Sequence, residues 1–455
     1  MKNLLACLFF TLYITASHAQ AFKSEIQAFA KADSMQMPAP HGILFVGSSS
    51  FTKWRDVNEY FPGFGIINRG FGGSTLLDVI YYAKETIIKY NPKQIYIYCG
   101  ENDLASSDAI TPDSVLNRLK RLYGIIRKGL GNKAEVVFVS IKPSVSRWRL
   151  ENKIIETNTL INAFLSSQRH ARFLDIHQAM LQADENVMTD IFIADNLHMN
   201  AKGYHIWQRI FAPTLIRMKN TFNPVVAHRG AWKKNGLPEN SIASLNQAIA
   251  LGCYGSEFDV RMTSDDSLVI NHDAHYHGML IEKTTYDELT KFTLSNGEKL
   301  PTLREYITAG TSNNNYTKLV CEIKPSELGT DQAKKIVDKV LNLFAEMKAE
   351  KQVVYISFDV NMVNRIREVN KKAKVQYLNG DIAPDVLAKK SIDIDYHFSV
   401  FKAHPEWISL AKSKKVILNA WTVNDSKTID ELLSAGFDLI TTNEPELVFD
   451  RIKNQ

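Results

Sequence analysis

Two acidic residues stand two positions apart in an otherwise apolar run near the middle of the chain. The stretch "GSEFDVRM" carries Glu257 and Asp259, and a second apolar run shortly after it ends in His272 and Asp273. Side chains at positions i and i+2 of a strand point to the same face, so both carboxylates would share one face. Their oxygens suit a hard cation such as Mg²⁺ or Ca²⁺, and a nearby histidine suits proton transfer at neutral pH. The stretch therefore predicts a metal and acid–base site.

The same spacing occurs in "CEIK", where Glu322 and Lys324 would share a strand face, and "AHRG" brings His228 and Arg229 to the end of another strand. Arginine and lysine are suited to holding a phosphate. For any one of these residues, an ion pair at a strand end is the alternative. Seven groups on three strands and one hairpin favour a common site, because carboxylates placed this close would repel one another without compensation.

A second set of reactive residues lies in the first half of the chain. In "VGSSSF" a strand runs into a serine turn, and in "DNLH" Asp195 and His198 are one turn apart, so that the carboxylate can fix the tautomer of the imidazole. The glycine-rich "NRGFGGST" and the segment "YCGENDL" follow two further strands. Serines and glycines also make ordinary turns, but four such blocks at successive strand ends favour a serine hydrolase.

The elements that would position this second set alternate between strands and helices. Short β-branched runs separated by amphipathic segments predict a parallel sheet covered on both faces by helices, with the functional loops at the carboxyl ends of the strands. The expected strands are 42–47, 64–70, 94–100, 135–141 and 171–176.

The second half of the chain contains nine strand-like runs, whereas a (β/α)₈ barrel needs eight. The loop "RMTSDD" after the Glu257 strand is too short for a parallel crossover, so "SLVINH" (267–272) is expected to return as a hairpin. Eight barrel strands remain, and the hairpin would carry His272 back to the carboxyl end of the barrel, where TIM barrels place their chemistry. The expected barrel strands are 225–228, 256–260, 318–323, 353–358, 374–378, 393–399, 416–421 and 438–442.

The N-terminus and the change of pattern near Pro224 divide the chain. Lys2, the apolar stretch "LLACLFFTLYITA" and the small-residue site Ser17-His18-Ala19 predict a signal peptide over 1–19, and hence an exported protein, periplasmic or secreted. Cys7 precedes most of the apolar stretch, which argues against lipidation. We expect one domain over 20–219 and a second over 220–455.

Composition excludes several classes of protein. The net charge of +5 is small for 455 residues, and no basic run is interleaved with aromatic residues, so nucleic acid is not an expected partner. No apolar stretch after the signal approaches the roughly 18–20 residues of a membrane helix. Cys99, Cys253 and Cys321 lie in strand-like or helical runs, which predicts buried thiols and neither a disulfide framework nor a zinc site.

Residues 223–455 resemble the glycerophosphodiester phosphodiesterase family along the whole of this range. The matching stretches occur in the family's order, and they are "AHRG", "PENS", "EFDV", "HD", "EIK", "AWTVN" and "TTNEP". The resemblance implies a TIM barrel that hydrolyses small glycerophosphodiesters with a divalent cation, Mg²⁺ or Ca²⁺. In the family's usual mechanism, the 2-hydroxyl of the substrate attacks phosphorus, and water opens the resulting cyclic phosphate.

The same resemblance assigns roles to individual residues. Glu257, Asp259 and Glu322 would bind the cation, with Glu239 as a weaker fourth candidate. His228 and His272 would be the acid–base pair, Arg229 and Lys324 would hold the phosphate, and Trp421 would pack against the glycerol. One position departs from the family, since Asn443 stands where many members have aspartate, and we expect little effect on catalysis.

Residues 41–219 resemble the SGNH (GDSL-like) esterase superfamily. The resemblance implies a three-layer α/β hydrolase with Ser49 as nucleophile, Asp195 and His198 as the rest of the triad, and Gly73 and Asn102 in the oxyanion hole with the Ser49 amide. No cofactor is implied for this domain. Ser48 replaces the usual aspartate, which leaves Ser48 and Ser50 as alternative nucleophiles.

Together the two resemblances predict an exported hydrolase with two active sites. Its small-molecule substrates would be glycerophosphodiesters for the barrel and acyl esters for the first domain, and the fusion suggests that a lysophospholipid is deacylated first. The alternatives are a carbohydrate O-acetylesterase fused to a phosphodiesterase that acts on a surface polymer, or a protein in which one domain only binds. The sequence does not decide between Mg²⁺ and Ca²⁺, or between these ester substrates.

Overall fold

The computed structural model describes residues 21–216, 222–312, 314 and 316–453. The expected signal peptide and the expected domain boundary at 219/220 lie outside these residues. The chain divides into two compact units, residues 1–218 and 219–455, and each is described by itself.

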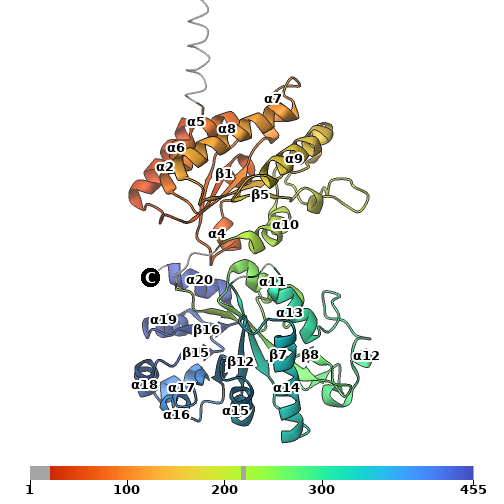
Figure 1. Cartoon of the computed structure of the whole chain (residues 1–455), viewed down its shortest axis with the longest axis vertical. Coiled ribbons are helices and arrows are strands. Elements are labelled where there is room, and N and C mark those ends of the chain that lie inside the picture. Colours follow the sequence, from red (N-terminus) through yellow and green to blue (C-terminus); the bar gives the residue numbers. More distant parts are fainter. Residues whose placement is uncertain (1–20, 217–221, 313, 315, 454–455) are drawn as a thin grey trace, which may run out of the picture. The chain divides into compact units, whose positions relative to one another are not determined.

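The first unit is a parallel five-stranded sheet (Figure 1) in the order β2-β1-β3-β4-β5. Its strands are β1 (Ile43–Gly47), β2 (Ile66–Gly70), β3 (Gln94–Tyr98), β4 (Glu135–Val139) and β5 (Ala171–Leu174). Every pairing between neighbours is parallel, for example Ile43 with Ile66 and with Gln94. The predicted parallel sheet is confirmed, and each strand begins and ends within a few residues of its expected position.

Helices cover both faces of this sheet because successive side chains of each strand point to opposite sides. On one face, Leu44, Ile95 and Val136 are fully buried in the cluster that includes helices α5 (Leu76–Tyr81), α8 (Pro112–Leu130) and α9 (Glu151–Ser166). On the other face, Phe45 lies 5.4 Å from Phe211 of α10 (Ala201–Phe211), ring centre to ring centre. Helix α2 (Lys23–Met35) contributes Ile26 to the first of these clusters.

The second unit is a closed barrel of eight parallel strands. The order runs from β11 through β16 to β6 and β7, and a pairing between β7 and β11 closes it. The barrel strands are β6 (Val225–Ala227), β7 (Gly255–Met262), β11 (Lys318–Ile323), β12 (Val353–Ser357), β13 (Val375–Tyr377), β14 (Asp393–His397), β15 (Leu418–Trp421) and β16 (Leu439–Thr442). The predicted TIM barrel is confirmed.

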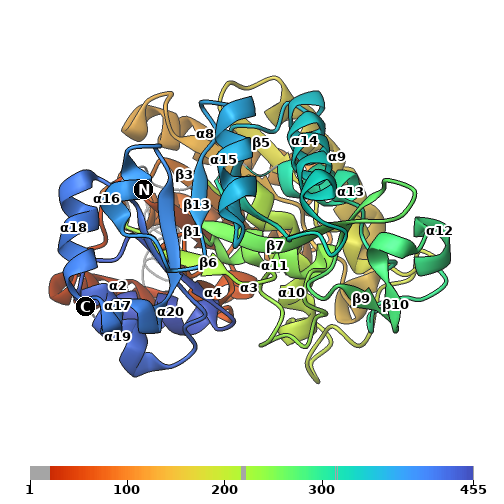
Figure 2. The ribbon, with the colours of Figure 1, turned by 90° about the horizontal axis from the view of Figure 1, so that it is seen from below.

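The ninth strand-like run, β8 (Leu268–Ile270), pairs antiparallel with β7, and Val260 faces Ile270. It is the expected hairpin return. The short strands β9 (His275–Tyr276) and β10 (Met279–Leu280) and helix α12 (Tyr286–Leu289) continue this segment at the periphery of the barrel (Figures 1 and 2).

Helices enclose the barrel strands, as Figure 2 shows for the unit that contains β6, β7 and β13. They are α11 (Ile242–Leu251), α13 (Leu303–Thr311), α14 (Thr330–Glu346), α15 (Val360–Val369), α16 (Pro384–Ala388), α17 (Phe398–Ala403), α18 (Glu406–Lys414), α19 (Ser426–Ser434) and α20 (Pro445–Lys453). Buried aliphatic residues such as Leu245, Leu319 and Val337 fill the layer between helices and strands, and each contributes about 1.5–3 kcal/mol.

The three cysteines of the described ranges, Cys99, Cys253 and Cys321, are buried, as predicted. In the part of the chain that the structure describes, no helix combines the length and the apolar character needed to cross a membrane.

Candidate active sites

The barrel mouth brings three buried carboxylates together. Glu257 and Asp259 of β7 and Glu322 of β11 offer oxygens that all lie within 4.8 Å of one another. The register explains this, because β7 and β11 are neighbours and Asp259 pairs with Glu322. Glu257 is 2% exposed, and its Oε1 has no hydrogen-bond partner among the described residues. A buried carboxylate oxygen without a partner is costly, so this cluster fits a divalent cation.

Lys324 lies inside the same cluster. Its Nζ is 2.8 Å from Asp259 Oδ1 and 2.7 Å from Glu322 Oε1. The ammonium group thereby offsets part of the negative charge. Even so, burial and the neighbouring carboxylate Asp259 raise the pKa of Glu257 well above its usual range, and the same two causes raise the pKa of Glu322.

Arg229 is placed over the carboxylates by an unusual backbone conformation directly after β6. With φ at 56°, its N–H donates to Glu257 Oε2 over 2.8 Å, while its Nε lies 3.6 Å from Asp259 Oδ2. Its Nη1 donates to Glu239 Oε1 over 2.9 Å. Glu239 is therefore a partner of Arg229, and it is not part of the three-carboxylate group.

The two predicted acid–base histidines have different partners. His228 follows β6, and its Nδ1 lies 2.8 Å from Asn443 Oδ1. Because an amide oxygen can only accept, this contact keeps the proton on Nδ1 and leaves Nε2 able to accept a proton. Burial, with the nearby Arg229 charge, lowers the pKa of His228 to about 4, so the imidazole is neutral at pH 7.

His272 lies on the hairpin and is more exposed, at 37% of its side chain. Its Nδ1 is 2.7 Å from Asp273 Oδ1, so the carboxylate can orient the imidazole ring. The backbone carbonyl of His272 accepts two hydrogen bonds from Arg261 of β7, which tie the hairpin to the barrel.

A cavity of about 120 Å³ lies at the barrel mouth, and seven of the predicted residues line it. Its lining combines charged residues with the apolar side chains of Ile356, Phe358, Leu378 and Trp421. The predicted residues on its wall are His228, Arg229, Glu257, His272, Glu322, Lys324 and Trp421.

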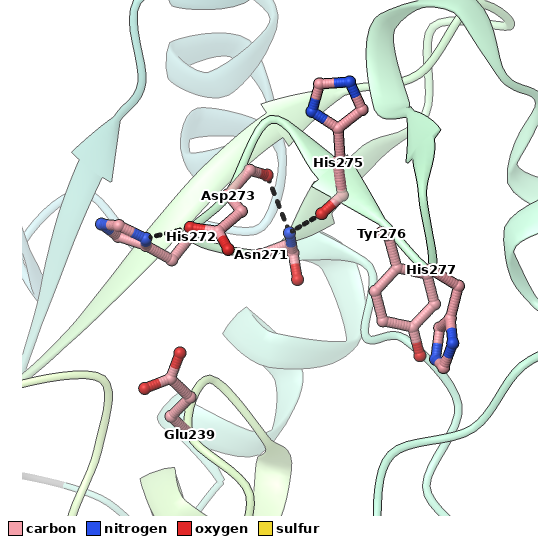
Figure 3. A pocket seen from close by; sticks show the side chains of 7 residues that line it. All are labelled: Glu239, Asn271, His272, Asp273, His275, Tyr276 and His277. Atoms are coloured by element: carbon pink, nitrogen blue, oxygen red, sulfur yellow. Dashed lines mark hydrogen bonds and ion pairs between the residues drawn. The ribbon is translucent and has the colours of Figure 1, made fainter.

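His272 also borders a second, more polar cavity of about 230 Å³ on its far side. Figure 3 shows Glu239 facing Asp273 and His272 across this cavity, with Tyr276 and His277 at the other end. His272 therefore lines both the smaller, partly apolar cavity and the open polar one. This position suits a residue that donates a proton to an alcohol leaving through the polar cavity.

The sequence reasoning missed two barrel residues. Asp395 of β14 is 1% exposed and lines the smaller cavity, and burial next to Glu322 raises its pKa well above the usual range. Phe358 lies 5.4 Å from Trp421 in edge-to-face contact. The i, i+2 rule that selected Glu257 and Asp259 would also have selected Asp393 and Asp395 in "DIDYH".

In the first unit, the serine turn follows β1 directly. Gly47 is required there, because a Cβ at this position, with φ at 131°, would lie 2.0 Å from Tyr98 O. Ser48 caps the short helix α3 (Ser49–Thr52) and is 2% exposed, and Ser50 is 1% exposed. Ser49 is half-buried, so it is the most accessible of the three serines. Accessibility favours Ser49 as the nucleophile.

Asp195 and His198 form the expected pair. Asp195 Oδ2 lies 2.6 Å from His198 Nδ1, and Asp195 Oδ1 accepts the N–H groups of Leu197 and His198. Burial opposes the shift, but the hydrogen bond from His198 lowers the pKa of Asp195. The Ser49 hydroxyl and His198 Nε2 have no hydrogen-bond partner within the described part of the chain, so both remain free to act on a substrate.

Asn102 follows β3 at the start of α7 (Glu101–Ser106) and is held from two sides. Its Nδ2 donates to Ser48 Oγ over 2.6 Å and to Ser74 O over 3.1 Å. Its Oδ1 accepts from Arg147 Nη2 over 2.9 Å. The amide therefore directs its donor end toward the serine turn, next to Gly73, which takes a φ of 84° in the glycine-rich turn.

Arg147 is a residue that the sequence reasoning did not select. It lies in the 3₁₀ helix η2 (Val145–Leu150), whose Ser146 N–H donates to Asn196 O between the two catalytic candidates of the "DNLH" loop. Its Nη1 lies 3.7 Å from Glu101 Oε1, and Glu101 in turn pairs with the fully buried Lys142 at 2.9 Å. Because no short motif surrounds Arg147, its contact with Asn102 depends on the fold.

Residues 228–447 match the model of the glycerophosphoryl diester phosphodiesterase family. A solved glycerophosphodiester phosphodiesterase from Parabacteroides distasonis is 36% identical, with a TM-score of 0.50, over 52% of this chain and 99% of that one. The chain belongs to this family. Residues 43–206 match the GDSL-like Lipase/Acylhydrolase family, which confirms the predicted fusion.

Two curated relatives each match about half of this chain. A glycerophosphodiester phosphodiesterase of Caldanaerobacter subterraneus is 28% identical over 248 residues, which are 50% of this chain and 97% of the relative. One from Bacillus altitudinis is 25% identical over 238 residues, 49% of this chain and 95% of the relative. The protein is thus a phosphodiester hydrolase joined to a GDSL-type esterase.

Proposed function

We propose that the phosphodiesterase domain hydrolyses small glycerophosphodiesters with a divalent cation held by Glu257, Asp259 and Glu322. The observation that carries the proposal is the group of three buried carboxylates beside two histidines and two cations in one small cavity. When bound, the cation would supply positive charge to the phosphate and to the attacking oxygen. Mg²⁺ and Ca²⁺ both fit the all-oxygen ligand set.

The protein side chains then divide the proton transfers. His228, neutral with a bare Nε2, takes the proton of the glycerol 2-hydroxyl as that oxygen attacks phosphorus. His272, held by Asp273, gives a proton to the departing alcohol on the side of the larger cavity. In the second step water attacks the cyclic phosphate, His272 takes the proton of the water, and His228 returns its proton to the 2-oxygen. Arg229 and Lys324 hold the charged phosphate throughout.

For the GDSL-type domain, we propose that Ser49 is the nucleophile, His198 the base and Asp195 its orienting carboxylate. Asn102, Gly73 and the Ser49 amide would stabilise the oxyanion. No cofactor is needed for this chemistry. The ester is proposed to be the acyl ester of a lysophospholipid, so that one domain produces the substrate of the other. An acetylated carbohydrate is the competing substrate.

The experiment that tests this assignment uses the full chain and two single variants. Wild type, Ser49→Ala and Glu257→Ala are each assayed on glycerophosphocholine and on a short-chain acyl ester. We expect Ser49→Ala to lose only ester hydrolysis and Glu257→Ala to lose only phosphodiester hydrolysis. Loss of both activities in either single variant, with the fold intact, would contradict two independent sites.

Export is a further part of the proposal. The positive start, apolar stretch and Ser17-His18-Ala19 site support a signal peptide that is removed before Gln20. N-terminal sequencing of the protein recovered from the periplasm or medium is expected to begin at Gln20. Retention in the cytoplasm with an intact N-terminus would contradict export.

A further inference from the structure

Asp395 is a buried acidic residue in the wall of the barrel cavity. The same wall includes Phe358, Leu378 and Trp421, and Asp395 is buried next to Glu322. Trp421 Nε1 donates to the backbone carbonyl of Asp395 over 2.9 Å, which fixes the indole and leaves the Asp395 carboxyl group out of the contact.

The Asp395 carboxyl makes no hydrogen bond to any residue that the structure describes. Its Oδ1 is buried and without a partner, and the whole residue is only 1% exposed. Leaving a buried polar group unpaired destabilises a protein by about 1–3 kcal/mol. A well-packed apolar residue would serve the barrel better if stability alone mattered. The position is therefore suited to a partner that arrives with the substrate.

The shape of the site limits what that partner can be. In the proposed reaction, the 2-hydroxyl of glycerol faces His228. The glycerol backbone then packs against Trp421, whose indole is held by the Asp395 carbonyl, so the terminal hydroxyl reaches the part of the wall that carries Asp395, Phe358 and Leu378. A hydroxyl group in such surroundings needs a hydrogen-bond acceptor. Asp395 is a carboxylate on that wall, and its oxygens can accept from a hydroxyl.

We propose that Asp395 recognises the free terminal hydroxyl of the glycerol moiety and so selects fully deacylated glycerophosphodiesters. This inference rests on the proposed phosphodiesterase site and names its substrate class. A 1-acyl lysophospholipid carries its chain on this very oxygen and has no hydroxyl there to donate. The cavity of about 120 Å³ corresponds to about four water molecules of roughly 30 Å³ each, which is space for a small polar group.

Two substrates that differ only in the terminal group test the inference. Glycerophosphocholine carries the terminal CH₂OH, whereas 2-hydroxyethyl phosphocholine keeps the attacking hydroxyl and lacks it. We expect wild-type kcat/KM to be about 10- to 100-fold higher for glycerophosphocholine, because the glycol substrate leaves the buried Asp395 carboxyl group without a partner. Equal kcat/KM for the two substrates would overturn the inference without any variant.

The variants then locate the effect at Asp395. Asp395→Leu is expected to lose the preference for glycerophosphocholine, because its kcat/KM for this substrate falls to the value for 2-hydroxyethyl phosphocholine. Its kcat/KM for 2-hydroxyethyl phosphocholine should stay within about threefold of the wild-type value. Asp395→Asn, which keeps an acceptor oxygen, is expected to retain most of the preference. Asp381→Asn, at an exposed aspartate outside the cavity, is the matched control and should behave like wild type on both substrates.

Thermal stability distinguishes substrate recognition by Asp395 from a purely structural role. Asp395→Leu is expected to have a Tm at least as high as that of wild type, because an unpaired buried carboxyl is removed. Equal losses of activity on both substrates, or a clearly lower Tm, would overturn the inference. Absence of wild-type activity on both substrates would instead refute the proposed function.

Discussion

Lys324 Nζ lies 2.8 Å from Asp259 Oδ1, within the group of carboxylates proposed to bind a cation. The lysine was expected to hold the phosphate, and the structure also makes it the counter-charge of Asp259. Two further carboxylates of the group, Glu257 and Glu322, have raised pKa values because they are buried next to Asp259. A bound cation is therefore expected to displace protons from this cluster.

Cation binding should release protons and should tighten as the pH rises. A raised pKa means that Glu257 is protonated over a range of pH in which a normal glutamate is charged, and the ligand form must be the charged one. Isothermal titration calorimetry with Mg²⁺ and Ca²⁺, in buffers of different ionisation enthalpy at pH 6, 7 and 8, measures both effects. Affinity that is independent of pH, with no proton release, would contradict the raised pKa values.

Ester hydrolysis should depend on Ser49 and should not respond to chelators. Ser49→Ala is expected to lower kcat by several orders of magnitude, as loss of a triad nucleophile does. Ser48→Ala and Ser50→Ala are the matched comparisons on either side. If one of these is the inactive variant and Ser49→Ala is not, the nucleophile has been placed on the wrong serine.

Arg147→Ala should lower ester kcat by about 10- to 100-fold with little change in KM, because the Asn102 amide loses the contact that orients its donor end. The effect should be much smaller in an Asn102→Ala background, since Arg147 acts through Asn102. Arg149→Ala, on the same 3₁₀ helix in an exposed ion pair with Asp108, is the control and should stay close to wild type. Additive losses in the double variant would show that Arg147 acts by another route.

The two sites should act in series on a lysophospholipid. Intact protein is expected to release free fatty acid first and glycerol phosphate second, while Ser49→Ala should stop both products. His272→Ala should let the glycerophosphodiester accumulate. Head-group release from the lysolipid by Ser49→Ala at the wild-type rate would refute the order. Turnover of an acetylated sugar without fatty-acid release would favour the carbohydrate esterase.

Much of the fold followed from local patterns. The eight remaining strand-like runs of the second half predicted the barrel. The short loop "RMTSDD" predicted the antiparallel return of β8, because a parallel crossover needs more residues than this loop provides. Strand periodicity also placed the parallel sheet of the first unit. These features depend on neighbours in sequence, which a single chain displays directly.

Other features could not be predicted because they depend on contacts between distant residues. Arg147 meets Asn102 across 45 positions, and Asn443 meets His228 across 215. The replacement of aspartate by Asn443 was expected to have little effect on catalysis. In the structure, Asn443 is the residue whose side-chain oxygen sets the tautomer of His228. The unpaired state of Asp395 is likewise visible only once β14 is placed in the barrel.

The barrel site is proposed to hydrolyse glycerophosphodiesters with a cation held by its three carboxylates. The most direct test of this proposal is the release of glycerol phosphate from glycerophosphocholine by the Ser49→Ala protein, before and after treatment with excess EDTA and after addition of Mg²⁺ or Ca²⁺. We predict that EDTA abolishes the activity, that one of the cations restores it, and that Glu257→Ala or Asp259→Ala is inactive under all conditions while remaining folded. Full activity in excess EDTA would contradict the account.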